Sequence, residues 1–501
     1  MRTLSKSKLI AFRQCPKRLW LEVHSPTLRA DSAATQASFA SGHAIGDIAR
    51  ALYDPYGRGA LIDVAGEGFD AALKRSQTLL EHTAQPVFEA GFRAAGAIAF
   101  ADVMLPCKGR SGRGRQWRMV EVKSSTSVKD YHRDDAAIQA FVAQEAGVKL
   151  AQIAIAHVNA EWVYPGGDDY RGLLLEHDVT EDAFARREEV RQWLADAQTV
   201  VAKRKAPALT TGAHCESPFA CGFIGHCRSS EAQATHPVQW LPRPTGKLRA
   251  HIDAHAVTEM ADVPDALLNE QQRRVKQATL TARPIFDQKA ARAALSPHRL
   301  PAYFLDFETI SYVIPRWAGT RPYEQIPFQF SLHRLSRTGK LQAAGSLDLS
   351  GDDPRESFTQ ALLAACGERG PIFVYNAGFE SARIGALAQR FPGAAPALEA
   401  LRERLVDLLP IAREHYYHPS QQGSWSIKAV LPALCPDLDY DDLDGVQDGG
   451  AAMDAYLEAT HPATTPDRKA EIERQLRAYC ALDTYGLARL WAAFTGSTIT
   501  D

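Results

Sequence analysis

The segment PAYFLDFETI (301–310) places two acidic residues inside a run of apolar side chains. Asp306 and Glu308 are two residues apart, and the period of a β-strand directs such residues to the same face. Two carboxylates on one buried face repel each other and lose hydration, which is costly unless a cation compensates both. Because Mg²⁺ prefers carboxylate oxygens, the segment predicts a buried strand that contributes to a divalent-metal site.

Two later segments can complete this C-terminal site. YNAGFE (375–380) follows a strand that reads as buried, and it places Glu380 at the start of a predicted helix. AYCALDTYGLARLW (478–491) predicts an amphipathic helix on which Tyr479 and Asp483 lie one turn apart on the same face. A tyrosine in this position can orient an attacking water, and acids from three elements can hold two metal ions.

A second group of acids lies on two predicted N-terminal strands, AIAFADVML (97–105) and QWRMVEVKS (116–124). Asp102 belongs to the first strand, and Glu121 and Lys123 share one face of the second. Two acids in this D…ExK pattern can bind Mg²⁺ or Mn²⁺, while the lysine positions or polarises a hydroxide nucleophile. The alternative is an exposed strand that carries the pattern without a metal.

Three polar residues accompany this pattern. Gln139 lies on a helix predicted for 134–147, where its side chain can face the metal. His43 lies on another predicted helix, in SGHAIGDIA, and an ordinary polar or capping role is the alternative for it. Glu89, in PVFEAGF, is a weaker candidate for a further acid.

The chain has eight cysteines, three of which form the pattern C-x5-C-x5-C at Cys215, Cys221 and Cys227. A disulfide framework does not suit a large cytoplasmic protein, whereas clustered cysteines inside a cell indicate metal. Cys15, in FRQCPKRLW, can supply a fourth ligand from far upstream and so join the two ends of the domain.

Length and composition indicate a protein of several domains. The 501 residues exceed one ordinary domain, and 45% hydrophobic with 23% charged residues is typical of soluble globular proteins. No run approaches the roughly 18 apolar residues that cross a bilayer, and no secretory signal opens the chain, so a cytoplasmic location is expected. The expected parts are an N-terminal α/β domain, a helical connector and a C-terminal α/β domain, over 1–235, 236–300 and 301–501.

Apolar periodicity predicts the remaining elements. A strand is expected at 152–158, and one long amphipathic helix at 181–205. The C-terminal domain is expected to contain a hairpin joined by SRTG, then a helix, then a buried strand, at 326–350, 354–366 and 371–377.

Net charge is −2, so bulk charge does not identify a nucleic-acid-binding protein. Six basic residues nevertheless gather around the second N-terminal strand: Lys108, Arg110, Arg113, Arg115, Arg118 and Lys123. They indicate either a phosphate-contacting edge or a solvated loop between two strands. An acidic run at 436–450 predicts a solvated loop, and a gate near the C-terminal site is the alternative.

The C-terminal motifs resemble those of DEDD exonucleases of the RNase H-like fold, the DnaQ-like group. FLDFET is similar to their first motif, and NAGFE to their second, which usually ends in aspartate where this chain has Glu380. Tyr479 and Asp483 match the third motif in its tyrosine variant. Asp407 and SWSIKAVL (424–431) resemble features between the second and third motifs. The resemblance implies a three-layer RNase H-like domain, with metal on Asp306, Glu308 and Asp483 and catalytic roles for Glu380 and Tyr479.

The N-terminal part resembles the iron–sulfur members of the RecB-like PD-(D/E)XK nucleases. The motif residues follow in the family's order: His43, Asp102, Glu121, Lys123 and Gln139. The resemblance implies a structural [4Fe–4S] cluster held by Cys15, Cys215, Cys221 and Cys227. Zinc is the alternative metal, with His214 or His226 as substitute ligands, although zinc sites prefer ligand spacings of about two to four residues. The family often has tyrosine where this chain has Ala143.

Together the two resemblances suggest a bacterial family that joins both modules. The expected function is metal-dependent hydrolysis of phosphodiester bonds at two sites, with Mg²⁺ or Mn²⁺ and with exonuclease action. DNA is favoured over RNA as the partner, a role in DNA processing, repair or defence is compatible, and no membrane or protein partner is indicated. The alternative is a nucleic-acid-binding scaffold with one or both sites inactive, which Glu380 and Ala143 favour.

Overall fold

The computed structural model describes residues 2–108 and 115–500. The chain divides into two compact units, the first formed by residues 1–232 with 312–324 and the second by residues 233–311 with 325–501. Both units combine helices with a sheet, so the protein is mixed α/β, as the sequence predicts. In the described part of the chain, no helix has both the length and the apolar character needed to span a bilayer.

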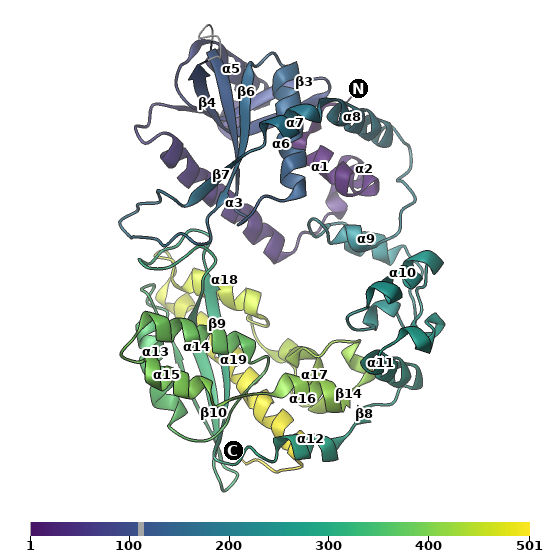
Figure 1. Ribbon diagram of the computed structural model, residues 1–501, viewed down its shortest axis with the longest axis vertical. Helices are drawn as coiled ribbons and strands as arrows, with labels where there is room; N and C mark the ends of the chain where they lie inside the picture. Colours follow the sequence, from purple (N-terminus) through teal and green to yellow (C-terminus); the bar gives the residue numbers. More distant parts are fainter. Residues whose placement is uncertain (1, 109–114, 501) are drawn as a thin grey trace. The chain divides into compact units, whose positions relative to one another are not determined.

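The first unit is built on a seven-stranded sheet (Figure 1). Its path runs β2-β3-β4-β5-β6-β7, and β1 pairs with β4. β3, β4 and β5 are antiparallel neighbours, whereas β5 and β6 run parallel. The bounds are β1 (Leu4–Ser5), β2 (Ala60–Leu61), β3 (Val87–Ala94), β4 (Ala97–Lys108), β5 (Arg115–Lys123), β6 (Leu150–Val158) and β7 (Leu174–Asp178). The three strands predicted at 97–105, 116–124 and 152–158 are therefore confirmed, with ends that differ by a few residues.

Helices cover this sheet and form the main core of the unit with it. Ile138 and Phe141 of α6 pack in one apolar cluster with Met119 of β5 and Ile153 of β6. The helices of the unit are α1 (Lys6–Gln14), α2 (Pro16–His24), α3 (Ala33–Tyr53), α4 (Val64–Glu67), α5 (Phe69–His82), α6 (Asp130–Glu145), α7 (Thr180–Ala185), α8 (Arg187–Val201) and α9 (Ile224–Ser229).

The prediction of one helix over 181–205 is wrong, because the chain breaks at Arg186 between α7 and α8. Arg186 leaves helical geometry at φ −85° and ψ 9°. Its guanidinium pairs with Asp134 of α6 at 2.6 Å and lies over the ring of Trp193 at 5.0 Å. The spacing of apolar residues gives no information about these tertiary contacts. It continues across Arg186 and therefore predicts a single helix.

The second unit contains a five-stranded sheet of order β11-β10-β9-β12-β13. β9, β10 and β11 are antiparallel, whereas β12 runs parallel to β9 and β13. The bounds are β9 (Ala302–Ser311), β10 (Gln325–Leu335), β11 (Leu341–Leu347), β12 (Ile372–Val374) and β13 (Leu405–Asp407), with a small separate pair of β8 (Ile285–Phe286) and β14 (Tyr416–Tyr417). The predicted hairpin and the buried strand after it are confirmed.

α13, α14 and α15 lie on one face of this sheet, and α19 lies on the other (Figure 1). The core of the first face joins Leu305 and Phe307 of β9 to Phe358, Ile384 and Leu398 of those helices. The helices are α10 (Gly246–His255), α11 (Glu270–Thr281), α12 (Gln288–Leu295), α13 (Arg355–Cys366), α14 (Gly378–Arg390), α15 (Ala395–Arg402), α16 (Leu408–His415), α17 (Ile427–Leu434), α18 (Gly449–Ala459) and α19 (Pro466–Thr495). The segment expected as a helical connector supplies α10 to α12 and belongs to the second unit.

Candidate metal centres

Strand register brings the N-terminal acids together. Phe88 pairs with Val103 and Ala90 with Ala101, so Glu89 of β3 stands level with Asp102 of β4. The β4–β5 pairing begins at Val103 and Val120, one step from Asp102 and Glu121. The carboxylate of Asp102 accepts the backbone N–H of Val122 at 2.6 Å. Three acids therefore follow one another across three neighbouring strands.

Glu89, the weakest of the predicted acids, has a backbone feature that supports it. Its φ is +56°, a left-handed conformation that is uncommon for a residue other than glycine. Strain of this kind concentrates at functional sites. Burial and the nearby charge of Glu121 raise the pKa of Glu89, while Arg50, Lys6 and His43 oppose the rise.

Glu121 is the centre of this first acidic site. Its side chain is 1% exposed and accepts hydrogen bonds from Lys123 Nζ at 2.6 Å and from Lys6 Nζ at 2.8 Å. The amide of Gln139 also donates to Glu121, while the expectation that Gln139 faces a metal stays a prediction. Burial alone would raise the pKa of Glu121, but the ammonium groups of Lys123 and Lys6 outweigh burial and lower it. Glu121 is therefore held as a carboxylate.

Sequence reasoning missed two members of this site, Lys6 and Asp135. Asp135 pairs with Lys123 Nζ at 2.6 Å and with Lys6 Nζ at 3.3 Å. Asp135 lies one helical turn before Gln139 on α6, and that spacing was a usable signal. Lys6 carried no local signal, because 115 residues separate it from Glu121. Burial and the neighbouring Glu121 raise the pKa of Asp102, so its carboxylate form is unfavourable in the metal-free protein.

His43, a predicted member of the site, lies on α3 with an exposed side chain. Within the described residues no hydrogen bond joins it to an acid, although its charge opposes the raised pKa of Glu89. Ala143, where the resembling family often has tyrosine, is fully buried in the core. A different tyrosine, Tyr131, lies two turns before Gln139 on α6 and lines the cavity that also contains Lys6.

The four predicted cysteine ligands line one pocket. Cys15 lies at the junction of α1 and α2, Cys215 and Cys221 lie in the segment before α9, and Cys227 lies on α9. All four are buried, with exposed fractions of 7–9%. His214 also lines the pocket, whereas His226 does not. The structure thus brings together residues that are far apart in the sequence.

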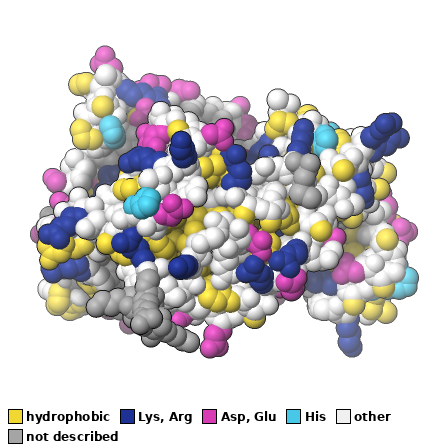
Figure 2. Space-filling view, turned by 90° about the horizontal axis from the view of Figure 1, so that it is seen from above, with side chains coloured by type: hydrophobic (Ala, Val, Ile, Leu, Met, Phe, Trp, Pro, Cys, Tyr) yellow, Lys and Arg dark blue, Asp and Glu magenta, His cyan; other side chains and the backbone are white. Residues whose placement is uncertain are grey.

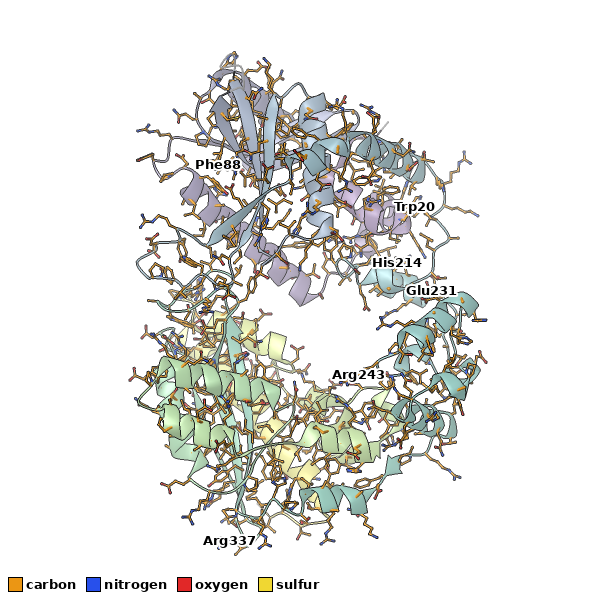
Figure 3. The ribbon with its side chains drawn as sticks, viewed as in Figure 1. Trp20, Phe88, His214, Glu231, Arg243 and Arg337 are labelled. Atoms are coloured by element: carbon orange, nitrogen blue, oxygen red, sulfur yellow. The ribbon has the colours of Figure 1, made fainter. Side chains whose placement is uncertain are left out.

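Specific hydrogen bonds hold the cysteine segment against the first two helices. Gln14 Nε2 donates to the carbonyls of His214 and Phe219, both at 2.7 Å. Glu231 accepts both the N–H and the hydroxyl of Thr211 at 2.7 Å. These bonds join the residues just before and just after the segment that carries Cys215, Cys221 and Cys227. Trp20 of α2, labelled with His214 and Glu231 in Figure 3, donates to Lys203 O at 2.9 Å. The pocket is therefore built by contacts on several sides.

The C-terminal acids form a second site. Asp306 and Glu308 lie on β9, and Asp483 lies on α19 with 5% of its surface exposed. Among the described residues, Asp306, Glu308 and Cys480 are the one set of three metal-ligating side chains whose ligand atoms lie within 4.8 Å of one another. Burial and Asp483 raise the pKa of Glu308 to about 8, and burial raises that of Asp483 to about 6. Burial, Asp483 and Glu308 also raise the pKa of Asp306.

Buried polar contacts fix α19 against the sheet and so position Asp483. Thr484 Oγ1 lies 2.8 Å from Ser331 Oγ and 2.8 Å from His333 Nδ1, both on β10. Gln329 Nε2 donates to Leu476 O at 2.8 Å. Ser331 pairs with Asp306 across β9 and β10. These bonds fix the register of α19, which carries both Cys480 and Asp483. Asp483 lies outside the 4.8 Å set of Asp306, Glu308 and Cys480, but near enough for its charge to raise the pKa values of Asp306 and Glu308.

Two tyrosines and a lysine cover the second site. Tyr479, one turn before Asp483, is 5% exposed, and its ring packs edge-on against Tyr440 at 6.2 Å. The hydroxyl of Tyr440 donates to Asp483 Oδ1. Lys428 Nζ lies 5.2 Å from the centre of each ring. Tyr440 belongs to the acidic run at 436–450, whose acids are exposed as predicted, but sequence reasoning missed this buried tyrosine.

Glu380 and Asp407 have different surroundings. Glu380, at the start of α14 as predicted, is 2% exposed, and its Oε2 has no hydrogen-bond partner among the described atoms. Burial raises the pKa of Glu380 to about 8, and its charge contributes to the raised pKa of Asp306. Asp407 instead accepts the backbone N–H groups of Asn376, Ala377 and Leu409 at 2.9–3.1 Å. Asp407 therefore holds the segment that leads into α14.

These raised pKa values predict how stability depends on pH without metal. Glu308 binds its proton more tightly in the folded protein, so its stabilising contribution is present below about pH 4.5 and is lost as pH rises through about 8. We expect Glu308→Gln, in EDTA, to resemble the wild type near pH 4.5 and to be more stable at pH 8 by on the order of 2–4 kcal/mol. Denaturant unfolding across this pH range measures the difference, and a constant difference would contradict the assignment.

The predicted basic edge is only partly described. Arg110 and Arg113 lie outside the described residues, as does the side chain of Lys108. Arg118 pairs with Glu176, and Arg115 donates to Glu81 O at 3.3 Å. On the face shown in Figure 2, lysine and arginine side chains are interspersed with acidic ones. A phosphate-contacting edge here stays a prediction.

Comparison with known proteins adds one finding. Residues 303–426 are similar to a domain of unknown function (DUF2779). The matched segment contains Asp306, Glu308, Glu380 and Asp407 and ends before Tyr479 and Asp483. A search of curated proteins finds no match.

Proposed function

We propose that the protein is a metal-dependent nuclease that hydrolyses phosphodiester bonds at two separate sites. The observation that carries the proposal is a group of four acids, Asp306, Glu308, Asp483 and Glu380, of which Asp306 is half-buried and the other three are buried. Glu380 Oε2 lacks a hydrogen-bond partner among the described atoms, and the pKa values of all four acids are raised although Lys428 and Arg383 lie close enough to oppose the rise. Such a set of like charges is stable as carboxylates only when a cation joins it.

At the second site, Asp306, Glu308 and Asp483 would hold Mg²⁺ or Mn²⁺. A bound divalent cation activates water and stabilises the leaving oxygen in phosphoryl transfer. Tyr479, one turn from Asp483, is placed to orient a water molecule. Glu380, although one methylene longer than aspartate, lies close enough to raise the pKa of Asp306 and can take part in the same ligand set.

At the first site, Asp102 and Glu121 would hold a divalent cation, with Glu89 as a further acid. Lys123, fixed by Glu121 and Asp135, is positioned to polarise a nucleophilic water. Gln139 donates to Oε2 of Glu121, whereas Lys6 and Lys123 both contact Oε1, and so helps to orient this carboxylate. The donors present are all oxygen atoms of carboxylates, which suits Mg²⁺ and Mn²⁺.

The four cysteines fit a [4Fe–4S] cluster. Tetrahedral thiolates around a single zinc ion lie about 3.8 Å apart, given a Zn–S distance of about 2.3 Å. Here no three of the four sulfur atoms lie within 4.8 Å of one another. Four buried thiols from separate segments in one pocket support a metal centre with four thiolate ligands, and their spacing suits the larger cluster as the metal-free structure has it.

We also propose the finer fold assignments implied by the motifs. The antiparallel β11-β10-β9 strands with parallel β12 and β13, covered by helices on both faces, support an RNase H-like second unit. Acids on β4 and β5 beside a helix that carries Gln139 support a PD-(D/E)XK first unit. These folds agree with the predicted order of the motifs in each part.

The test is a cutting assay on protein purified anaerobically. Single- and double-stranded DNA and RNA are incubated with Mg²⁺ or Mn²⁺, with EDTA as the metal-free reference. We expect cation-dependent cutting by the wild type and loss of part of it in each of Asp102→Ala and Asp306→Ala. Loss of all cutting in Asp102→Ala, with none lost in Asp306→Ala, would reduce the second unit to a binding role. Unchanged cutting in both variants would refute the site assignments.

A further inference from the structure

Lys6 reaches the first acidic site from the start of α1. β1 pairs with β4 through Leu4 and Ser5, which places the following residue beside the acids of the sheet. Ser5 caps α1, accepting the N–H of Lys8 at 3.3 Å. Lys6 is thus held by two backbone elements, and its Nζ lies 2.8 Å from Glu121.

Lys6, Lys123, Glu121 and Asp135 form an electrically neutral group of four in the metal-free protein. A divalent cation bound at Glu121 adds two positive charges next to two ammonium groups. Coulomb repulsion at such distances, in a partly buried site, is several kcal/mol. Asp102 and Glu89 bring two further negative charges to the cation, but Oε1 of Glu121 already accepts from both lysines and Oε2 accepts from Gln139. A cation that binds Glu121 therefore competes with the lysines for that carboxylate.

Lys6 is the more weakly held of the two lysines. Lys123 contacts both acids at 2.6 Å and shares a strand with Glu121. Lys6 has contacts of 2.8 Å and 3.3 Å and comes from a separate helix. It lines a cavity of about 960 Å³ together with Arg18, Arg29, Phe39, Tyr131 and Phe219. Three acids, Glu22, Asp31 and Asp135, also line this cavity and pair with Arg18, Arg29 and Lys6. Positive and aromatic side chains along one cavity are typical of surfaces that bind single-stranded nucleic acid.

We propose that Lys6 is a substrate-binding residue, which releases Glu121 when a divalent cation binds there and then holds a phosphate oxygen of the strand in the cavity. The inference rests on the nuclease function proposed for the first site. The inference predicts that removal of Lys6 changes two affinities in opposite directions. The affinity for the cation should rise, because Lys6 competes with it for Glu121, and the affinity for nucleic acid should fall, because Lys6 attracts a phosphate. A lysine that only stabilises the fold would not affect the two affinities in opposite directions.

The test uses full-length protein that carries Asp306→Ala. This substitution disables the second site, so that cation binding and cutting are measured at the first site. Titration calorimetry measures the Kd for Mn²⁺, and cutting of a single-stranded oligonucleotide at several salt concentrations measures KM and kcat. We expect Lys6→Met to bind Mn²⁺ about tenfold more tightly and to raise KM about tenfold. The slope of log(kcat/KM) against log salt should become less steep by about 0.7, one phosphate contact on a single strand.

Two further variants control this result. Lys6→Arg keeps the charge and should keep KM near the parent value, and Lys8→Met removes a lysine from the same helix and should change neither affinity. Unchanged Kd and KM in Lys6→Met, or weakening of both with a lower melting temperature, would overturn the role of Lys6. If the parent itself neither binds Mn²⁺ nor cuts, the proposed function of the first site fails, and the inference fails with it.

Discussion

Replacing Asp306 by asparagine is expected to lower cation-dependent cutting at the second site by at least about 10³-fold, because several kcal/mol of transition-state stabilisation by the cation are lost. The same substitution should make the metal-free protein more stable. Burial and the charges of Asp483 and Glu308 raise the pKa of Asp306, so its carboxylate is unfavourable without a cation. An amide of the same size removes that charge.

Melting temperatures in EDTA and in Mn²⁺ measure both expected effects, the higher stability of the metal-free variant and its weaker stabilisation by the cation. The wild type should melt at a higher temperature with Mn²⁺ than in EDTA, and Asp306→Asn should show a smaller gain. Asp352→Asn, which changes an exposed aspartate of the same unit, is the matched control and should behave as the wild type. A variant that is less stable in EDTA and keeps the full Mn²⁺ gain would show that Asp306 is not a ligand.

Replacing Cys221 by serine is expected to remove the iron and to destabilise the first unit. Cys221 lines the pocket with the other three predicted ligands, and its N–H donates to Cys215 O at 2.8 Å. A cluster held by residues 15 to 227 joins the two ends of the unit, so its binding energy contributes to folding. We expect a loss of several kcal/mol in the free energy of unfolding, on the order expected for structural metal sites.

Iron content, visible absorption and thermal melting of anaerobically purified protein test this expectation. The wild type should hold about four iron atoms per chain and absorb visible light. Cys107→Ser, which changes a half-buried cysteine of β4 outside the pocket, should keep both properties. A colourless wild-type protein that contains zinc would refute the iron–sulfur assignment.

Features encoded by local pattern could be predicted from the sequence. Period-two alternation placed Asp306 and Glu308 on one strand, and helical spacing placed Tyr479 and Asp483 on one helix face. The apolar run before Glu380 predicted the strand that leads into α14. In each case the helix or strand is determined by a short local segment of the sequence.

Features that depend on tertiary contacts could not be predicted in this way. Lys6 meets Glu121 only because β1 pairs with β4, which no local pattern encodes. Tyr440 lies in an acidic run, and only its packing against Tyr479 and its bond to Asp483 reveal it as part of the site. The break at Arg186 likewise follows from contacts with another helix.

Counting the Mn²⁺ ions that the chain binds tests the central claim most directly. Titration calorimetry on the wild type, Asp102→Ala, Asp306→Ala and the double variant gives the number of sites and their affinities. Two independent carboxylate sites predict that each single variant loses a different part of the binding and that the double variant binds no Mn²⁺ tightly. Binding that stays unchanged in the double variant would contradict the assignment of both metal centres.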